Sequence, residues 1–448
     1  MVDVHGSDFA NRGRAQTASL PPDPAARLHR GYAAPANRRA AAGDIRLTPY
    51  PYRAMLAICS DLDETPDRQT YREIARFFNT EQDTAIGRGV GLEVGNSIYF
   101  NMPAWQFAYW NTDDAGRAMV RTLIHSGHID CLHSYGDLAD SRDQAAAALD
   151  ELVHHDCRLT VWVDHAVAPT NFGADIMHGH GDEPGHPAYH ADLTLAYGIG
   201  YVSRGRATSV LGQDVRPRVW EVLRAAHPLA TGRTLAKEQV KRILGRLGHR
   251  KYDIHVLNEV LRPIRLRDGS PCWEFLRCNP CWLGVGECAS GRQIGQVLTA
   301  ELVDRLAQRG GLCVLYTHLG KHQPAGQPIP FDEPAVQGLR RVQQAQQAGH
   351  ILTTTTRRLL GFARARREVA YRWVAQRGEY RLEITSAGTG ASPLAASDLD
   401  GLTFYTDHDR TTVTVDGREV AGVIHNGPDE TGRRSVSLPW HRLEFPQL

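Results

Sequence analysis

The sequence contains no long apolar run and no excess of charge of either sign. No stretch approaches the roughly 18 consecutive apolar residues that a membrane span needs, and the first residues lack the apolar segment of a secretory signal. Lys and Arg number 51 against 50 Asp and Glu, so the chain has no overall field that would gather nucleic acid or anionic membrane. We therefore expect a cytoplasmic protein that binds neither nucleic acid nor membrane.

Cysteine is also scarce, with eight residues in a chain of 448. This number and its scatter do not resemble the disulfide framework of a small secreted domain, so we expect mostly reduced thiols. Hydrophobic residues make up 42% of the chain, which provides enough apolar material for a large core. A chain of this length is typical of a β/α barrel followed by a smaller module.

The order of apolar runs predicts where the barrel begins and ends. Residues 1–45 are rich in Ala, Arg, Pro and Gly without an apolar period, which indicates a poorly ordered segment. Residues 46–368 alternate between buried strand patterns such as AMLAICS, ending at Ser60, and amphipathic helices such as TPDRQTYREIARFFN, with Thr65 expected as its N-cap. This alternation predicts an α/β fold, in outline a parallel β/α barrel.

Two regions depart from the alternation. Residues 205–298 break the rhythm and are expected to form an insertion between barrel strands. Residues 369–448 contain short alternating runs separated by Gly, Asp and Pro, which predicts a small C-terminal antiparallel β-domain.

The first strand is followed by two carboxylates, Asp61 and Asp63, in the segment SDLDET. Residues two apart in a strand face the same side, so both carboxylates should point together at the carboxyl end of the strand, where barrel enzymes keep their catalytic residues. One carboxylate could hold a divalent metal while the other takes a proton from the metal's water. The alternative is a pair of loop carboxylates that cap the next helix.

The third strand ends in GHIDCLHSYGD, which places His133 and Asp137 four residues apart. A strand end followed by a turn can bring such a pair onto one metal, and imidazole with carboxylate suits zinc or another divalent ion. Taken alone, His133 could equally be a hydrogen-bonded core residue.

Together, SDLDET, GHIDCLHSYGD and LYTHLGKH resemble the first, second and last motifs of the polysaccharide deacetylase superfamily (NodB-like, carbohydrate esterase family 4), in the same order. The resemblance covers about residues 55–361 without the insertion. It implies a distorted (β/α)7-8 barrel of the glycoside hydrolase/deacetylase type and a metal-dependent hydrolase, with Asp61 as the general base, Asp63 and His133 as metal ligands and His318 as the general acid.

The chain departs from the family pattern at two places. Asp137 stands where the second ligand histidine is usual, and His165 in WVDHAVAPTNFG is the obvious substitute, so either residue could complete the ligand set. The family's third motif, with an Arg near a Pro, is missing. Asp164 and Asn171 occupy that region and are expected to contact the substrate.

Two further clusters carry metal-binding side chains. The run Cys272, Cys278, Cys281 and Cys288 could close a second, structural zinc site, and the alternative is ordinary buried thiols. The loop MHGHGDEPGHPAYH contains four histidines, which could bind a second metal, line a sugar cleft or form a solvated loop.

These patterns predict an N-deacetylase that uses a divalent metal, with Zn²⁺ expected, and acts on an amino sugar or sugar-containing small molecule. Two alternatives stay open: a glycoside hydrolase on the same barrel, which needs two carboxylates and no metal, and a non-catalytic carbohydrate-binding protein. The sequence leaves the acyl donor, the metal and the oligomeric state open.

Overall fold

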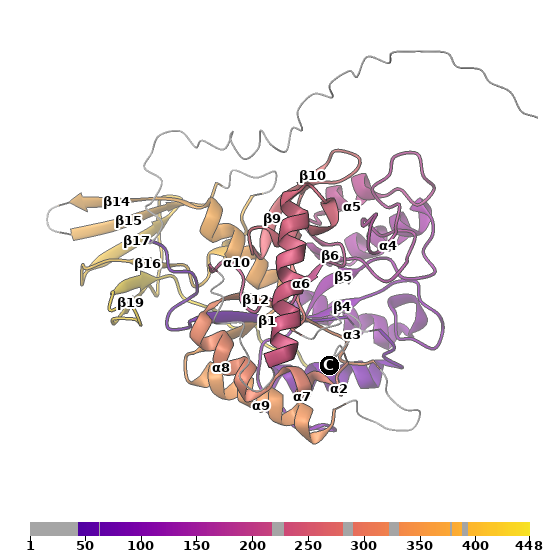
Figure 1. The fold of residues 1–448 in the computed structure, drawn as a ribbon, viewed down its shortest axis with the longest axis horizontal. Coiled ribbons are helices and arrows are strands. Elements are labelled where there is room, and N and C mark those ends of the chain that lie inside the picture. The colour runs from indigo at the N-terminus through magenta and orange to yellow at the C-terminus, as the bar shows by residue number, and fades with distance from the viewer. Residues whose placement is uncertain are drawn as a thin grey trace, which may run out of the picture. The chain divides into compact units, whose positions relative to one another are not determined.

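The computed structural model describes residues 44–61, 63–216, 228–280, 290–321, 331–376, 379–387 and 393–448. The expected N-terminal segment 1–45 therefore lies almost entirely outside the described residues. From Gly43 onward the chain belongs to one compact unit. It is a mixed α/β structure, in which a large curled sheet forms a half-barrel beside smaller sheets (Figure 1).

The large sheet has the strand order β8-β11-β12-β1-β4-β5-β6-β7-β10-β9, and β13 pairs with β1 as well. Every pair along this path is parallel except β9 with β10, so the predicted parallel sheet is confirmed. Its strands are β1 (Ala54–Ser60), β4 (Asn96–Ile98), β5 (Ile129–His133), β6 (Val161–Val163), β7 (Tyr201–Ser203), β8 (Ala207–Thr208), β9 (Leu261–Arg265), β10 (Pro271–Phe275), β11 (Arg277–Cys278), β12 (Gly311–Thr317) and β13 (Ile351–Thr354).

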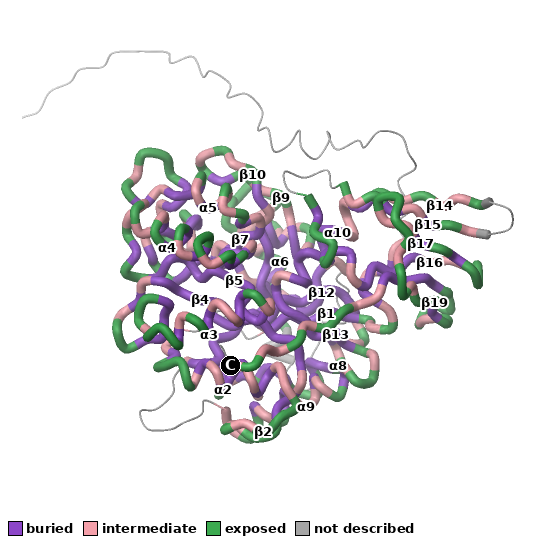
Figure 2. The backbone as a smooth tube through the Cα atoms, turned by 180° about the vertical axis from the view of Figure 1, so that it is seen from behind, coloured by how far each residue is buried: buried purple, intermediate pink, exposed green. Residues whose placement is uncertain are grey.

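Strand β1 is buried over its full length because both of its faces are covered. Leu56 and Ile58 pack in one hydrophobic cluster with residues of the helices on the outer side of the sheet, whereas Met55 and Ala57 pack in another with Leu359 of α10. This two-sided burial explains why the strand is a continuous apolar run rather than an alternating one. The tube in Figure 2 is accordingly purple along the central strands.

Helices connect the strands and cover the sheet. Helix α10 contacts β1, β5 and β9, which are well separated in the strand order, so it packs across the concave side of the curl. The helices are α2 (Arg68–Asn79), α3 (Asp114–His125), α4 (Arg142–His154), α5 (Ala191–Tyr197), α6 (Pro228–Arg246), α7 (Ile294–Val297), α8 (Ala300–Arg309), α9 (Glu333–Gln347) and α10 (Thr356–Glu368), with short 3-10 turns η1 (Tyr109–Asn111), η3 (Arg250–His255) and η5 (Ala396–Leu399).

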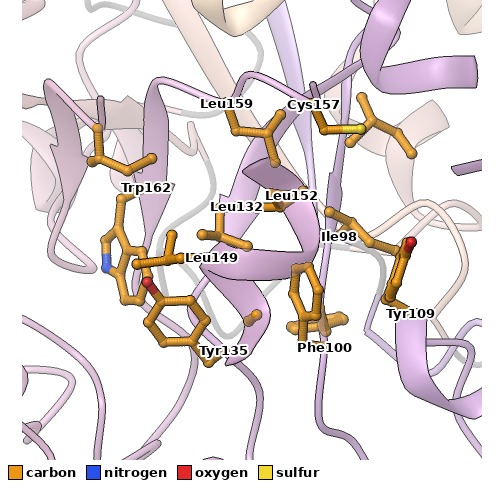
Figure 3. Packing of buried hydrophobic residues seen from close by; sticks show 14 of the residues in the cluster. Ile98, Phe100, Tyr109, Leu132, Tyr135, Leu149, Leu152, Cys157, Leu159 and Trp162 are labelled. Carbon is orange, nitrogen blue, oxygen red and sulfur yellow. The ribbon is translucent and has the colours of Figure 1, made fainter. Parts of the chain in front are cut away.

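A third hydrophobic cluster lies under α3, α4 and α5. Figure 3 shows Leu132 of β5 and Trp162 of β6 packed against Leu149 of α4, with Phe100 and Tyr109 beside them. These buried side chains hold β4, β5 and β6 in place, and with them the loops that follow each strand.

The insertion and the C-terminal region differ from the sequence-based expectation. The insertion, whose fold the sequence did not indicate, contributes β8, β9, β10 and β11 to the large sheet and places α6 over it. The C-terminal region forms two sheets, β14-β15-β17-β18 and β16-β20-β19. The pairs β14-β15, β17-β18, β16-β20 and β19-β20 are antiparallel, as predicted, whereas β15 and β17 pair in parallel. The strands are β14 (Ala370–Gln376), β15 (Glu379–Thr385), β16 (Thr403–Tyr405), β17 (Thr411–Val415), β18 (Arg418–Glu419), β19 (Ile424–Asn426) and β20 (Ser435–Ser437), and the separate hairpin is β2 (Asp83–Thr84) with β3 (Gly87–Arg88).

The first helix begins later than predicted. Asp67, not Thr65, is the N-cap of α2, and its carboxylate accepts from the backbone N–H of Thr70. The carbonyl of Thr65 instead accepts from the N–H of Phe107 at 2.7 Å. Thr65 therefore ties the loop after β1 to the loop after β4 at the carboxyl edge of the sheet.

Candidate functional site

Four side chains with catalytic chemistry meet at the carboxyl edge of the large sheet. Asp63 follows β1, His133 is the last residue of β5, His165 lies two residues beyond β6, and His318 follows β12 directly. Because β1, β4, β5 and β6 are parallel neighbours and β12 borders β1 on its other side, all of these strand ends lie along one edge. The structure thus brings the four predicted residues together.

Asp63 is the centre of this cluster. Its Oδ2 lies 3.2 Å from Nε2 of His165 and 3.2 Å from Nε2 of His318, and its Oδ1 lies 3.8 Å from Nδ1 of His133. The His133 ring stacks on Tyr99 at 4.6 Å between centroids and meets the His165 ring edge-on at 4.9 Å. The carboxylate therefore contacts three imidazoles from three different strands.

Asp61 is held separately by a buried arginine. Nη1 of Arg277 donates to Oδ2 of Asp61 at 2.6 Å, and both side chains are 1% exposed. The guanidinium lies 4.3 Å from the ring centroid of Tyr316, whose hydroxyl is 3.0 Å from Nε2 of His318. Asp61 also approaches Nε2 of His133 at 3.7 Å. A chain of contacts, two of them polar and the middle one a cation–π contact, therefore links Asp61 to His318 through Arg277 and Tyr316.

His165 bridges two carboxylates. While its Nε2 faces Asp63, its Nδ1 lies 2.8 Å from Oδ1 of Asp137. Histidines that bind metals usually give their second nitrogen to a carboxylate in this manner. The arrangement favours His165 over Asp137 as the donor nearest Asp63 and makes Asp137 the residue that orients the ring.

Burial and neighbouring charges give the titratable side chains of the cluster different protonation states. Burial lowers the pKa of His133 to about 4, so this imidazole is neutral at neutral pH. Burial also lowers the pKa of His165, but the adjacent carboxylates of Asp137 and Asp63 outweigh it and raise this pKa to about 10. Burial raises the pKa of Asp63, but the charge of His318 and the hydrogen bonds from both histidines hold it well below its usual value. Asp63 is therefore an anion over the whole physiological pH range.

The backbone turns sharply directly after three of the four donors. Glu64, Ser134 and Ala166 have φ values of 59°, 45° and 40°, although non-glycine residues seldom adopt positive φ. They follow Asp63, His133 and His165. Such conformations cost about 1–3 kcal/mol each and concentrate at functional sites, where the surrounding structure holds them.

Several buried polar atoms of the cluster lack hydrogen-bond partners among the residues the structure describes. They are Oδ1 of Asp61, Oδ1 of Asp63, the hydroxyl of Tyr99, Nε and Nη2 of Arg277, and Nδ1 of His165, which is close to Asp137 without the geometry of a hydrogen bond. Leaving a buried polar group unpaired costs about 1–3 kcal/mol, so unpaired groups call for an explanation. Open acceptors on both carboxylates are consistent with a site that receives a ligand.

The donor set fits a divalent metal by chemical type. One carboxylate and two imidazoles are common zinc ligands, and two ligands of one tetrahedral zinc lie about 3.4 Å apart, close to the 3.2 and 3.8 Å measured from Asp63 to His165 and His133. Within the described part of the chain, however, no group of three or more His, Cys, Asp or Glu residues is arranged so that it could hold a metal ion as it stands. In this arrangement the histidines pair with Asp63 directly.

Asp164 and Asn171, expected to contact the substrate, serve the loop instead. Both are 0% exposed. Asp164 accepts from Nε1 of Trp162 and from the backbone N–H groups of Phe172 and Gly173. Asn171 accepts from the N–H of His165 and donates to the carbonyls of His165, Ala166 and Met177. Their polar atoms are therefore occupied by the loop, which they fix so that His165 is presented to Asp63.

The described residues add little support for the two other candidate metal sites, the cysteine run and the histidine-rich loop. Cys272 and Cys278 are buried free thiols, and Cys281 and Cys288 lie outside the described residues, so the structural zinc site stays a prediction. In the histidine-rich loop, His190 is buried and bonded to Thr170 and Thr194. His180 and His186 stack at 4.1 Å, and Nδ1 of His180 lies 2.8 Å from Glu183.

Arg277 and Tyr316 were missed by sequence reasoning. Arg277 lies in a two-residue strand within the insertion, where no periodic pattern marks it. Tyr316 lies in the buried strand β12, two residues before His318, which follows the strand directly, so strand alternation could have identified it as sharing the histidine's side of the sheet.

No protein-family model, curated protein or solved structure matches this chain. Among the described residues, every helix is too short or too polar to cross a membrane. Arguments about function therefore rest on the site itself.

Proposed function

We propose that this protein is a metal-dependent hydrolase that removes an N-acyl group, such as acetyl, from an amino sugar or a sugar-containing metabolite. The observation that carries the proposal is the meeting of Asp63, His133, His165 and His318 at one sheet edge, with Asp61 held beside them by Arg277. The sequence motifs that contain Asp61, Asp63, His133 and His318 resemble those of polysaccharide deacetylases. We also propose that the half-barrel is the distorted barrel of that superfamily.

Asp63, His133 and His165 are the residues that would hold the metal, and Asp137 would fix the ring of His165 through its 2.8 Å contact. A bound divalent metal would supply a polarised amide carbonyl and a more acidic water. Neutral His133 and anionic Asp63 are already in the protonation states that metal ligands need, whereas His165, whose pKa is raised to about 10, would release a proton when a metal binds.

Asp61 is the proposed general base. Its Oδ1 lacks a hydrogen-bond partner among the described residues, while Oδ2 is fixed by Arg277, so one oxygen orients the carboxylate and the other can take a proton from water. His318 is the proposed acid that protonates the amine nitrogen as the C–N bond breaks. Tyr316, 3.0 Å from its Nε2, holds the ring. Amide and water together give a carboxylate and a free amine.

Apolar side chains on the neighbouring loops support a sugar ring as the substrate. Trp105, Leu138 and Val167 are all exposed and lie on the loops after β4, β5 and β6, which also carry Asp137 and His165. The first two loops are joined, because the N–H of Leu138 donates to the carbonyl of Asn101. A flat indole can pack against the apolar face of a pyranose.

The glycoside hydrolase alternative is less well supported. That chemistry needs one protonated carboxyl as the acid, whereas Asp63 has a strongly lowered pKa and Asp61 is ion-paired with a buried arginine. Both carboxylates also contact the same ring of His133, an arrangement better suited to a metal and a base than to an acid and a nucleophile.

Metal analysis combined with an acetate-release screen tests the proposal. We expect near-stoichiometric divalent metal in the purified protein and acetate release from N-acetylated amino sugars that stops with a chelator and returns with Zn²⁺. Glycan cleavage that survives full chelation would establish the glycoside hydrolase instead. Sugar binding without any turnover would establish a binding protein.

A further inference from the structure

Helix α6, drawn in front of the large sheet in Figure 1, packs against η3. Glu238, which is 5% exposed, is bonded to Thr208 and Ser209. Lys237 donates to Oγ of Ser209, and Lys241 donates to the carbonyl of Ala207. These polar anchors fix which face of the helix is turned toward the protein.

The outward face carries an apolar stripe, which we call the α6 stripe: Ala236, Val240, Ile243 and Leu247. All four are exposed, Val240 and Ile243 to 54% and Leu247 to 73%. The N–H of Leu247 donates to the carbonyl of Ile243, so the helical path reaches the end of the stripe. The spacing of four, three and four residues is the seam that a helix presents to a second helix. Most helices of soluble proteins point this seam inward.

The surface around the stripe is basic. Arg233 lies before it, Arg246 beside its end and Arg250 and Lys251 beyond it, and all four are exposed. The single acidic residue between positions 232 and 251 is the buried Glu238. A ligand of this surface must therefore offer an apolar strip flanked by negative charge.

We infer that the α6 stripe is a docking surface for an acidic amphipathic α-helix of a partner protein. A helix matches the width and period of the seam, and carboxylates at its flanks would meet the four exposed cations. A second copy of this chain would place like charges against each other, which disfavours self-association. The inference does not depend on the proposed hydrolase activity.

An anionic membrane surface is the main competing ligand. Interfacial helices usually carry aromatic or many large apolar side chains on the exposed face, whereas the α6 stripe is a narrow line of four aliphatic residues without Trp or Phe. The narrow seam favours a helix over a lipid surface.

Binding of a synthetic peptide to the full-length protein tests the inference. The probe is a fluorescent helical peptide of about three heptads, with Leu at its seam positions and Glu at the flanks, and a matched peptide carries Lys at the flanks. We expect the Glu peptide to bind at least about tenfold more tightly than the Lys peptide and to weaken as NaCl rises from about 50 mM to about 300 mM.

Variants of the stripe locate the binding. Ile243→Asp and, independently, Leu247→Asp should each weaken binding of the Glu peptide by about tenfold or more, while Val153→Asp, an exposed valine of α4, leaves it unchanged. The inference is overturned if the Glu peptide does not bind, or if it binds all variants equally. It is also overturned if the wild type, but not Ile243→Asp, floats with phosphatidylglycerol vesicles or dimerises.

Discussion

Two buried ionic clusters in this protein differ in how completely their acceptors are used. Glu274 of β10 is 0% exposed and accepts from Arg204, Arg206 and Arg262, so that each carboxylate oxygen has at least two donors. Asp61 and Asp63 each keep one oxygen without a hydrogen-bond partner among the described residues.

The difference separates a structural cluster from a functional one. Removing an ion from water costs several kcal/mol unless partners in the protein replace the lost hydration. For Glu274, the three arginines of the same chain are these partners. In the Asp63 cluster, Oδ1 of Asp61 and Oδ1 of Asp63 have no such partners among the described residues, and three residues with positive φ lie close by in the sequence. A bound ligand that contacts these two oxygens would explain why the chain itself provides no partner for them. The following predictions test this interpretation.

The largest effect is expected from removing a proposed metal ligand. His133→Ala should reduce bound divalent metal to background and abolish turnover, because catalytic metal sites have few protein ligands to lose. Fold and unfolding temperature should change little by comparison with changes at Glu274. Metal content by elemental analysis and acetate release are the measurements, and full metal occupancy in this variant would remove His133 from the ligand set.

Glu274→Gln should instead damage stability. The change leaves three buried or half-buried arginines with too few acceptors, and breaking a buried ion pair in this manner typically costs about 3–5 kcal/mol. Chemical denaturation measures the loss. Asp114→Asn, which breaks a surface ion pair with Arg117 and removes a charge from the first turn of α3, is the control and should cost less than about 1 kcal/mol. Metal content should stay at the wild-type level, and equal stability of the two variants would contradict the comparison.

Asp130 is another buried carboxylate, and it accepts from the backbone N–H of Arg357 at 2.8 Å. Burial raises its pKa to about 6, above an unfolded value of about 3.9. The folded state therefore binds more protons, so the contribution of Asp130 to stability is present at low pH and is lost as the pH rises through about 6. Relative to wild type, Asp130→Asn should gain about 1–3 kcal/mol in unfolding free energy between about pH 4 and pH 7. A pH-independent difference would show that Asp130 titrates normally.

The smallest effect is expected from changing an exposed side chain on a loop near the proposed site. Trp105 is 61% exposed on the loop after β4, so Trp105→Ala should raise KM by about 2- to 12-fold, the equivalent of an aromatic contact worth about 0.5–1.5 kcal/mol. The kcat value should be unchanged, because the contact binds ground state and transition state alike. Trp105→Phe should recover part of the loss. A fall in kcat with constant KM would place Trp105 in the reaction itself.

The sequence predicts the site to the extent that the strands determine it. Asp63, His133 and His318 follow apolar runs whose strand assignment is confirmed, and the ends of parallel strands share one edge. His165 was foreseen as a substitute ligand for the same reason. Each of these four positions depends only on local pattern and on the parallel topology.

The features that the sequence does not predict depend on contacts that form only when the chain folds. Arg277 donates to Asp61, which lies 216 residues earlier in the sequence. The strand of Arg277 has only two residues, which is too short to show an alternating pattern. Asp164 and Asn171 look like site residues by position, but their burial and their bonds to loop N–H and carbonyl groups emerge only once the loop closes on itself. Thr65 follows the usual pattern of an N-cap, yet its carbonyl is used by Phe107.

Zinc binding by Asp61→Asn and Asp63→Asn tests the central claim most directly, because two residues of one chemical type are assigned different roles by position and partners alone. Asp61→Asn should bind zinc nearly as tightly as the wild type while kcat falls by about 10²- to 10⁴-fold, the usual contribution of a positioned proton acceptor. Asp63→Asn should bind zinc at least about tenfold more weakly. Equal loss of zinc in both variants would make Asp61 a ligand, and wild-type zinc binding and turnover in both would contradict the assignment of this cluster as the catalytic site.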